Sequence, residues 1–173
     1  MTLSIRVARP DDYGEVATVI LSSYQEYQAT MGELWDHYRA DLADVAGRVA
    51  RGVVLVAELE GRIAGTVTYY LPNDDGSRED WFWWPPNFAY LRALGVDPAV
   101  RGRGVGRALS LAVIDAARGA SAAGVALNTV GFMAAAIALY EDLGFRRVAP
   151  DSAWEDYPLL SYTLELSDME VSR

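Results

Sequence analysis

Three glycines alternate with other residues between positions 101 and 107, where the chain reads R-G-R-G-V-G-R. Glycine lets the backbone approach a ligand closely, and the first N–H groups of a helix point at one spot with the positive end of the helix dipole behind them. This segment lies between an expected strand and an amphipathic helix, and it holds three arginines in an acidic chain. The pattern therefore predicts a diphosphate site. The alternative is a glycine-rich turn with solvated arginines.

Two common phosphate-binding motifs do not fit this segment. A Walker loop requires a lysine, and the chain contains none. The dinucleotide fingerprint G-x-G-x-x-G belongs in the first strand–helix turn of a βαβ unit. The glycines here have the spacing G-x-G-x-G and lie in the second half of the chain. The segment therefore predicts a phosphate site of another kind.

An aromatic run precedes the expected strand. Residues 81–90 read W-F-W-W-P-P-N-F-A-Y, with six aromatic side chains in ten positions. Aromatic rings near carboxylates can hold an organic cation, so the run predicts a pocket for a small amine. The residues that we expect to contact it are Trp35, Trp83, Trp84 and Tyr90. The alternative is that these rings cover a sheet edge or form a dimer interface, where Trp and Tyr are favoured.

Hydrophobic periodicity and turn signals predict the elements that position these residues. The expected strands cover residues 4–7, 53–59, 62–71, 91–96, 125–130, 145–148 and 161–166, and the expected helices cover 10–24, 34–51, a segment beginning near 105, and 134–143. The order is β-α-α-β-β-β-α-β-α-β-β. Three consecutive strands before a strand–helix–strand unit favour an α+β fold with a mixed sheet over a doubly wound parallel one.

Local signals refine these elements. Glu60-Gly61 is typical of a two-residue hairpin turn, and Gly144 is expected to end a helix in the left-handed conformation. Asp12 and Glu15 have the spacing of a capping box at the start of the first helix.

Length and composition bound the class of protein. The chain has 173 residues, of which 51% are hydrophobic and 23% charged, and this predicts one domain spanning residues 1–173. No apolar run reaches the ~20 residues that a membrane-spanning helix needs, and the first residues lack the pattern of a secretory signal. We therefore expect a cytoplasmic protein without a membrane partner.

The chain lacks the residues that several kinds of catalysis and metal binding require. The chain has no cysteine, no lysine and a single histidine, His37. Thiolate catalysis, cysteine metal sites and a lysine Schiff base are therefore excluded, and no metal site is expected. The net charge of −9 disfavours nucleic acid as a partner and favours a cationic substrate.

Four segments together resemble one known family, the GCN5-related N-acetyltransferases (GNAT). Its loop motif is Q/R-x-x-G-x-G/A, its preceding strand reads L-x-V before an x-P-x-x-R-G turn, and a later helix carries A-x-x-L-Y-x-x-x-G-F. The likeness spans nearly the whole chain. The matching segments are Arg101-x-x-Gly104-x-Gly106, Leu94-x-Val96 followed by Asp97-Pro98-x-x-Arg101-Gly102, Ala136-x-x-Leu139-Tyr140-x-x-x-Gly144-Phe145, and the opening Arg6-x-Ala8-Arg9-Pro10-Asp11-Asp12.

The resemblance implies a fold and an activity. The fold is a mostly antiparallel central sheet of about six or seven strands flanked by about four helices, as the family has it. The activity is that of an acyl-CoA-dependent N-acyltransferase, in which the amine of a small acceptor attacks acetyl-CoA directly within a ternary complex. The oligomeric state that we expect is a monomer or a homodimer.

The resemblance also assigns roles to residues. Tyr140 is the expected general acid for the departing thiolate. The main chain of Leu94 and Val96 is expected to contact the pantetheine arm and the thioester carbonyl. The residues expected to bind the diphosphate are Arg101, Gly102, Arg103, Gly104, Val105, Gly106 and Arg107.

Some points stay open. Met133 stands where the family often has an asparagine that contacts the cofactor. Gly95 predicts either a bulge in the cofactor strand or a simple packing position. The general base is not identified among Glu26, Glu33, Asp36, Glu79 and Tyr90. A non-catalytic acyl-CoA sensor is the main alternative function, and a nucleotide-binding domain is a weaker one.

Overall fold

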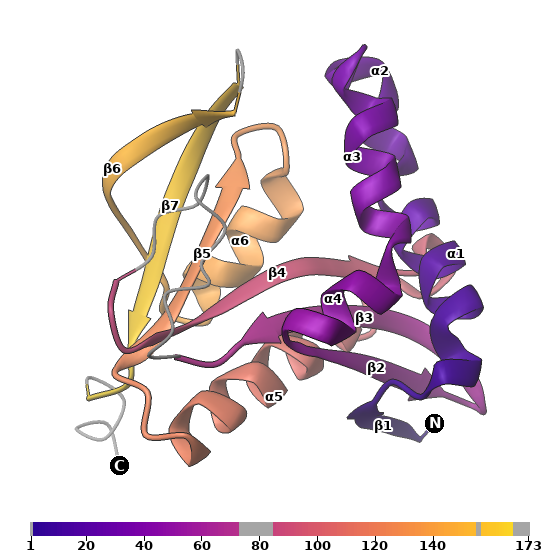
Figure 1. Cartoon of the computed structure of the whole chain (residues 1–173), viewed down its shortest axis with the longest axis horizontal. Helices are drawn as coiled ribbons and strands as arrows, with labels where there is room; N and C mark the ends of the chain where they lie inside the picture. Colours follow the sequence, from indigo (N-terminus) through magenta and orange to yellow (C-terminus); the bar gives the residue numbers. More distant parts are fainter. Residues whose placement is uncertain (1, 73–84, 155–156, 168–173) are drawn as a thin grey trace. The chain divides into compact units, whose positions relative to one another are not determined.

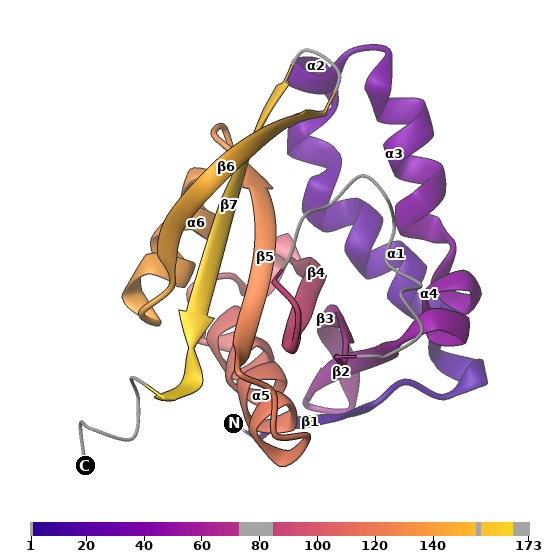
Figure 2. The same ribbon diagram turned by 60° about the vertical axis from the view of Figure 1, so that its left-hand side comes forward.

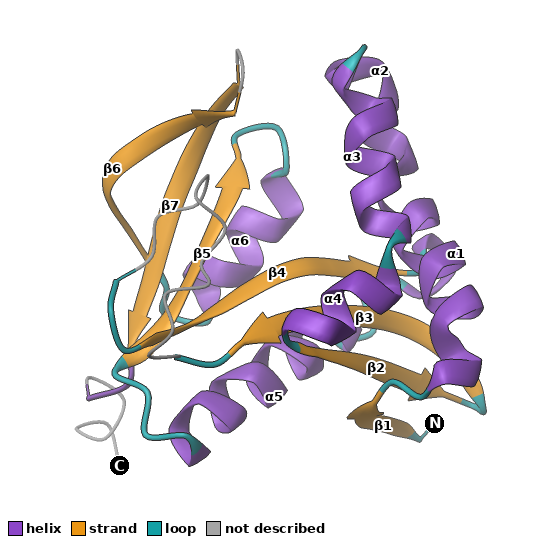
Figure 3. Cartoon of the chain, viewed as in Figure 1, coloured by secondary structure: helices purple, strands orange, loops and turns teal. Residues whose placement is uncertain are grey.

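The computed structural model describes residues 2–72, 85–154 and 157–167, and it divides into two compact units (Figure 1). Unit 1 comprises Met1–Tyr69 and Ala93–Ala112, and unit 2 comprises Tyr70–Arg92 and Val113–Arg173. Strand β4 (Phe88–Val96) and helix α5 (Val105–Gly119) contribute residues to both. The described residues form seven strands, mostly antiparallel, together with helices (Figure 3). This confirms the predicted mixed class.

The sheet of unit 1 begins with three consecutive antiparallel strands, β1 (Leu3–Val7), β2 (Val53–Leu59) and β3 (Arg62–Tyr70). Between β2 and β3, Glu60 has φ 54° and Gly61 has φ 77°. Two positive φ values in a two-residue loop are those of a type I′ turn, whose twist matches that of the flanking strands. The hairpin predicted at this dipeptide is confirmed.

The helices of unit 1 correct one prediction. A single helix was expected over residues 34–51, but the backbone leaves the helical region at Asp44, whose ψ is 68°. The Asp44 carboxylate instead accepts the Gly47 N–H at 3.0 Å and caps a new helix, the role that aspartate prefers over a helix interior. The helices are α1 (Tyr13–Tyr24), α2 (Gln28–Met31), α3 (Leu34–Ala43) and α4 (Val45–Arg51).

A buried arginine fastens these helices to the sheet. Arg48 of α4 is fully buried. Its guanidinium donates to the carbonyls of Asp41 and Leu42, at 2.8 and 2.7 Å, and to the Thr68 hydroxyl of β3 at 3.1 Å. It thereby binds two carbonyls in the last turn of α3, where helix carbonyls lack the full set of i+4 amide partners. Residues of α1, α4, β2 and β3 also form an apolar cluster, which includes Val16, Val19, Val45, Val54, Val56 and Ile63.

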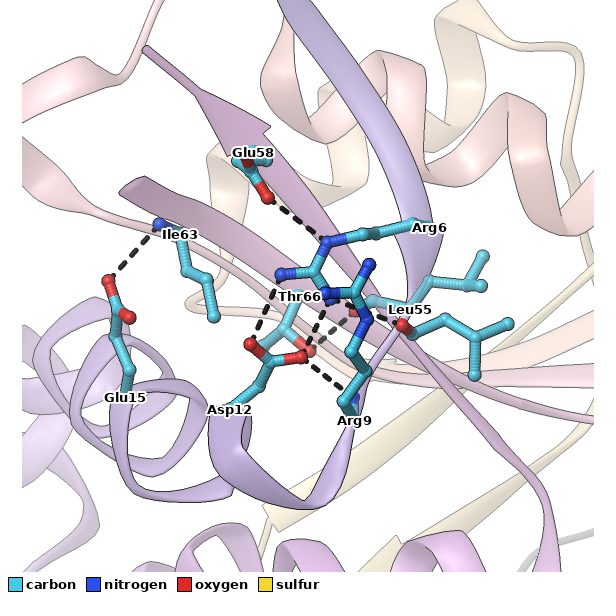
Figure 4. A network of polar contacts seen from close by, with 9 residues as sticks. Arg6, Arg9, Asp12, Glu15, Leu55, Glu58, Ile63 and Thr66 are labelled. Atoms are coloured by element: carbon cyan, nitrogen blue, oxygen red, sulfur yellow. Dashed lines mark hydrogen bonds and ion pairs between the residues drawn. The ribbon is translucent and has the colours of Figure 1, made fainter. Parts of the chain in front are cut away.

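An ion-pair network joins β1, β2 and the entry to α1 (Figure 4). The Arg6 guanidinium contacts the Asp12 carboxylate at 2.7 Å and that of Glu58 at 3.0 Å. The hydrogen bond from Arg6, reinforced by the Arg9 amide, lowers the pKa of Asp12 from 3.8 to about 2. The same carboxylates raise the pKa of Arg6.

The capping box expected at the start of α1 is not formed. Asp12 accepts the Arg9 N–H at 2.7 Å and faces back toward Arg6, so its side chain does not cap α1. Glu15 accepts the Ile63 N–H of β3 at 3.1 Å. Figure 4 shows the Asp12 carboxylate turned toward Arg6 and Arg9 and the Glu15 carboxylate turned toward Ile63. The predicted pair is therefore replaced by a local contact one turn earlier for Asp12 and by a contact with β3 for Glu15.

Unit 2 holds the first part of β4 and the remaining strands side by side (Figure 2). Residues 88–90 of β4 pair in parallel with residues 124–126 of β5, whereas β5 pairs antiparallel with β7 over seven residue pairs. Helix α6 ends before Gly144, whose φ of 96° confirms the predicted left-handed end. The elements are β5 (Gly124–Val130), α6 (Ala134–Asp142), β6 (Arg146–Trp154) and β7 (Tyr157–Glu165).

The last two strands are longer than predicted. We expected residues 145–148 and 161–166, whereas β6 extends to Trp154 and β7 begins at Tyr157. The β6–β7 register shifts between Val148 and Ser152. An irregularity at an edge strand accommodates a proline, which cannot donate a ladder hydrogen bond.

Candidate functional site

The glycine segment leads from the end of β4 into α5, within unit 1. Asp97 begins the turn: its carboxylate accepts the Ala99 N–H at 2.9 Å, and its own N–H donates to Ala64 of β3 at 2.8 Å. Gly102 and Gly104 follow with φ 78° and 81°. In this left-handed region a Cβ is strained, so glycine is required here by conformation. A Cβ at either position would meet no atom within 4 Å.

The first hydrogen bond of α5 runs from the Ala108 N–H to the Gly104 carbonyl, at 3.0 Å. The amides at the start of α5, those of Val105 and Gly106, therefore precede the first hydrogen-bonded turn and carry the positive end of the helix dipole. Gly104 beside them is exposed. Open space and helix-terminal donors together suit an anion. The residues expected to bind a diphosphate thus lie at a helix start with room for a ligand.

Arg101 holds this segment against the end of α1. Its guanidinium donates to the Ser23 carbonyl at 2.8 Å and pairs with the Glu26 carboxylate at 2.7 Å. The guanidinium of Arg101, a residue predicted to bind the diphosphate, is thus engaged with the end of α1 within unit 1. Tyr27, beside Glu26, has its pKa raised by burial and by the nearby carboxylate.

The end of α1 also contacts the strand expected to bind the cofactor. The Tyr24 hydroxyl donates to the Leu94 carbonyl at 2.9 Å. At Gly95, a Cβ would stand 2.3 Å from the Ser23 hydroxyl and 2.6 Å from Ile20, so this glycine permits close packing of α1. The irregular backbone of β4 lies at Ala93, with φ 52°, two residues before the position considered for a bulge. The sequence analysis did not predict the contacts that Ser23 and Tyr24 make with Arg101 and Leu94.

The main chain of β4 alternates its direction within unit 1. Because the Asp97 N–H donates to β3, the groups of Gly95 also face β3, and those of Leu94 and Val96 face away from it. Consistent with this, the Gly95 carbonyl oxygen lies 3.0 Å from where a Cβ on Gly65 would stand. The two residues predicted to contact the pantetheine arm therefore direct their main-chain groups to the same edge.

Tyr140, the expected general acid, lies in α6 of unit 2. Its side chain is buried, with 5% of its surface exposed, and its ring centroid is 5.7 Å from that of Phe145. Met133, where the family often has an asparagine, is the residue before α6; its side chain is buried and accepts a weak hydrogen bond from the Thr129 hydroxyl at 3.8 Å.

The residues expected to contact an amine are divided between the two units and the part of the chain that the structure does not describe. Trp35 is only 3% exposed in α3 of unit 1, which favours a packing role. Tyr90 is buried in unit 2 and its hydroxyl donates to Asn128 at 2.8 Å. Trp83 and Trp84 lie outside the described residues. Of the possible bases, Glu26 is engaged with Arg101, and Glu79 also lies outside the described residues.

Two further properties concern only the part of the chain that the structure describes. No three His, Asp or Glu side chains there come close enough together to hold a metal ion. No helix there has the length and apolar character to cross a membrane.

Comparison with known proteins matches residues 20–145 to the model of the acetyltransferase (GNAT) family. An N-acetylaspartate synthetase of Danio rerio is 37% identical over 62% of this chain and 33% of its own length. A mycothiol acetyltransferase of Sanguibacter keddieii is 33% identical over 65% of this chain and 36% of its own length. The matched part thus spans about a third of these relatives.

The fold has matching solved structures. A GNAT family acetyltransferase from Brucella melitensis, solved in complex with acetyl-CoA, has a TM-score of 0.62 at 23% identity, covering 95% of this chain and 88% of that one. The family model covers more than half of the residues, and its match includes both the glycine segment and Tyr140. The chain therefore belongs to the GNAT family of acetyltransferases.

Proposed function

We propose that the chain transfers an acetyl group from acetyl-CoA to the amine of a small acceptor. The observation that carries the proposal is the start of α5, where two glycines with positive φ, open space and helix-terminal amides are combined. These features fit a diphosphate. Family membership and an acetyl-CoA complex of a protein with the same fold support coenzyme A as the molecule that supplies it.

In this proposal the residues have separate tasks. The amides of Val105 and Gly106 bind the diphosphate, and the main chain of Leu94 and Val96 binds the pantetheine arm along the edge of β4 that faces away from β3. The thioester supplies the acyl group. The hydrogen bond from the Tyr24 hydroxyl to the Leu94 carbonyl fixes the orientation of the β4 main chain along this edge.

The chemistry is a single displacement. The neutral amine nitrogen attacks the thioester carbonyl, the C–S bond breaks, one amine proton leaves to water or a base, and Tyr140 protonates the departing sulfur. Stabilising the carbonyl oxygen requires a hydrogen-bond donor placed where charge develops, and a main-chain amide of β4 is our candidate. The net charge of −9 favours cationic amines as acceptors over anionic ones.

The test has a binding step and a turnover step. The melting temperature is measured with CoA, acetyl-CoA, longer acyl-CoAs, ATP and NAD. A ligand at a hundred times its Kd adds about 2.7 kcal/mol, which raises the melting temperature by roughly 5 to 11 °C for a chain of this size. We expect this shift with CoA and acetyl-CoA and a smaller one with ATP or NAD. Thiol release is then followed with a panel of small amines.

The outcomes separate the candidate functions. Thiol release that depends on an amine supports the acetyltransferase. Binding of acetyl-CoA without turnover on any amine identifies an acyl-CoA sensor instead. A shift as large with ATP or NAD as with CoA contradicts the proposal and favours a nucleotide-binding domain.

A further inference from the structure

A chain of polar side chains crosses three strands of unit 2. The Tyr90 hydroxyl of β4 donates to the Asn128 side-chain oxygen of β5 at 2.8 Å, and the Asn128 amide donates to the Ser161 hydroxyl of β7 at 2.9 Å. Tyr90 is 2% exposed and Ser161 is 1% exposed, whereas Asn128 between them is half-buried, so these bonds are partly shielded from water. A polar group that is removed from water destabilises the fold unless it has a hydrogen-bond partner. Each of these two bonds provides a partner for one donor and one acceptor.

The position of this chain within the sheet is specific. The parallel ladder between β4 and β5 covers three residue pairs among the described residues and ends with Tyr90 opposite Ala126. Asn128 lies two residues further along β5, on the same face as Ala126. Ser161 is opposite Asn128 in the β5–β7 register. The Tyr90–Asn128 bond therefore joins β4 and β5 at the point where their main-chain ladder ends.

Tyr90 is held from a second direction as well. Its ring stacks on that of Tyr70, with centroids 6.4 Å apart and planes 10° from parallel, and the two tyrosines form a buried cluster with Ala126. The ring contact fixes the plane of Tyr90, and the hydroxyl bond fixes its far end. An amide has distinct donor and acceptor ends, so the bond to Ser161 also determines which end of Asn128 faces Tyr90.

We propose that Asn128 is a positioning residue for acyl transfer. Through Tyr90 it holds the first part of β4 beside β5 within unit 2, and the same strand continues along the chain to Leu94 and Val96. The inference rests on the proposed function, because Leu94 and Val96, four and six residues after Tyr90, are the residues assigned to the pantetheine arm. The diphosphate site depends on the start of α5 and does not require Asn128.

This division suggests two ligands and four variants. Acetyl-CoA carries the arm, whereas 3′-phospho-ADP carries the same diphosphate without it. Tyr90→Phe removes one hydroxyl and keeps the ring. Asn128→Leu removes both bonds at similar volume, and Asn128→Asp keeps two acceptor oxygens for the hydroxyls of Tyr90 and Ser161. Thr163→Val is the matched control, since Thr163 lies on the same face of β7, opposite Ala126.

Affinities are measured by calorimetry, with melting curves to verify folding. Tyr90→Phe and Asn128→Leu are expected to weaken acetyl-CoA about fivefold to tenfold, the effect of one or two neutral hydrogen bonds, and to leave 3′-phospho-ADP within about twofold. Asn128→Asp and Thr163→Val are expected to retain both affinities. Should Asn128→Leu fail to fold, Tyr90→Phe decides the matter alone.

The contrary results are distinct. If the variants bind acetyl-CoA as tightly as the unaltered protein, or lose both ligands equally, the positioning role is wrong while the proposed function stands. If the unaltered protein binds neither ligand, the proposed function itself fails and the inference fails with it.

Discussion

Tyrosine hydroxyls mark several of the positions on which acyl transfer would depend. The Tyr24 hydroxyl holds a β4 carbonyl in unit 1, and the Tyr90 hydroxyl holds β5 in unit 2. Tyr140 differs from both because the role assigned to it is chemical: a phenol can protonate a thiolate as it departs. Its buried ring, packed on Phe145, has few orientations available, as a proton donor requires.

Replacing Tyr140 by phenylalanine tests that role. The ring and its packing remain, so we expect acetyl-CoA affinity to stay within about twofold, while kcat falls roughly 10²- to 10⁴-fold, the range for a positioned general acid. Tyr162→Phe is the control. It removes a tyrosine hydroxyl of β7 that donates to Glu141, which lies in α6 beside Tyr140. Steady-state kinetics on the best amine of the panel gives the comparison. Equal kcat values for the two variants would remove Tyr140 from the mechanism.

The site residues that the sequence predicted share one property. Tyr140 and the glycines lie in short motifs whose members are neighbours along the chain. Tyr24 and Asn128 were missed because their partners, Leu94 and Tyr90, are 70 and 38 residues away. A single tyrosine in an amphipathic helix, or a single asparagine in a strand, carries no local sign of such a partner.

At the scale of elements, the start of α5 concentrates the requirements of the proposed site. The helix is amphipathic and long enough to place a dipole behind its first amides. The conformations of Gly102 and Gly104 bring the chain into it, and no neighbouring atom fills the space that their missing side chains leave. Glycine is therefore needed at these two positions for its backbone conformation and for ligand access, since no neighbouring side chain would clash with a Cβ there.

Gly104→Ala separates this requirement from a general effect of alanine. An alanine at φ 81° costs about 1 to 2 kcal/mol, and relief of that strain moves the loop away from its present course. We expect lower stability and a CoA affinity at least tenfold weaker. Gly14→Ala in α1 is the control: it has open space and no positive φ, so alanine should stabilise by about 0.5 to 1 kcal/mol. Urea denaturation and calorimetry measure both effects. Unchanged CoA affinity in Gly104→Ala would argue against the diphosphate site.

Most element types followed from the sequence, whereas their limits depended on contacts between elements. The hairpin at Glu60-Gly61 and the helix end at Gly144 are local, and both were predicted correctly. The break at Asp44 was missed because the valines and leucines around it keep a helical period across the gap. The lengths of β6 and β7 were underestimated because they depend on the pairing of the two strands, which the local pattern of either one does not show.

For the molecule as a whole, charge sets the conditions under which it stays folded. The chain is acidic, with a net charge of −9, so its carboxylates repel one another unless they are paired. The Arg6 network pairs two of them and joins elements that lie far apart in the sequence. Family membership followed from motifs that span the chain, but this network was not predicted, because its members contact one another only after β1 and β2 have paired.

Acid unfolding of the Asp12→Asn variant measures what that network contributes. The folded pKa of Asp12, about 2, lies below its ordinary value of 3.8. A depressed carboxyl pKa stabilises the fold above pH 4, and this contribution is lost as pH falls from about 4 through 2. Because Arg6 and Asp12 are partly exposed, we expect Asp12→Asn to lower the free energy of unfolding by only about 1 kcal/mol at pH 7, or the melting temperature by roughly 2 to 4 °C. This deficit should shrink toward pH 2.

The control is Asp11→Asn, one residue earlier and exposed, whose free energy of unfolding should stay within about 0.5 kcal/mol of the unaltered protein at every pH. A deficit in Asp12→Asn that does not change between pH 7 and pH 2 would show that the ion pair contributes through packing and not through its charge.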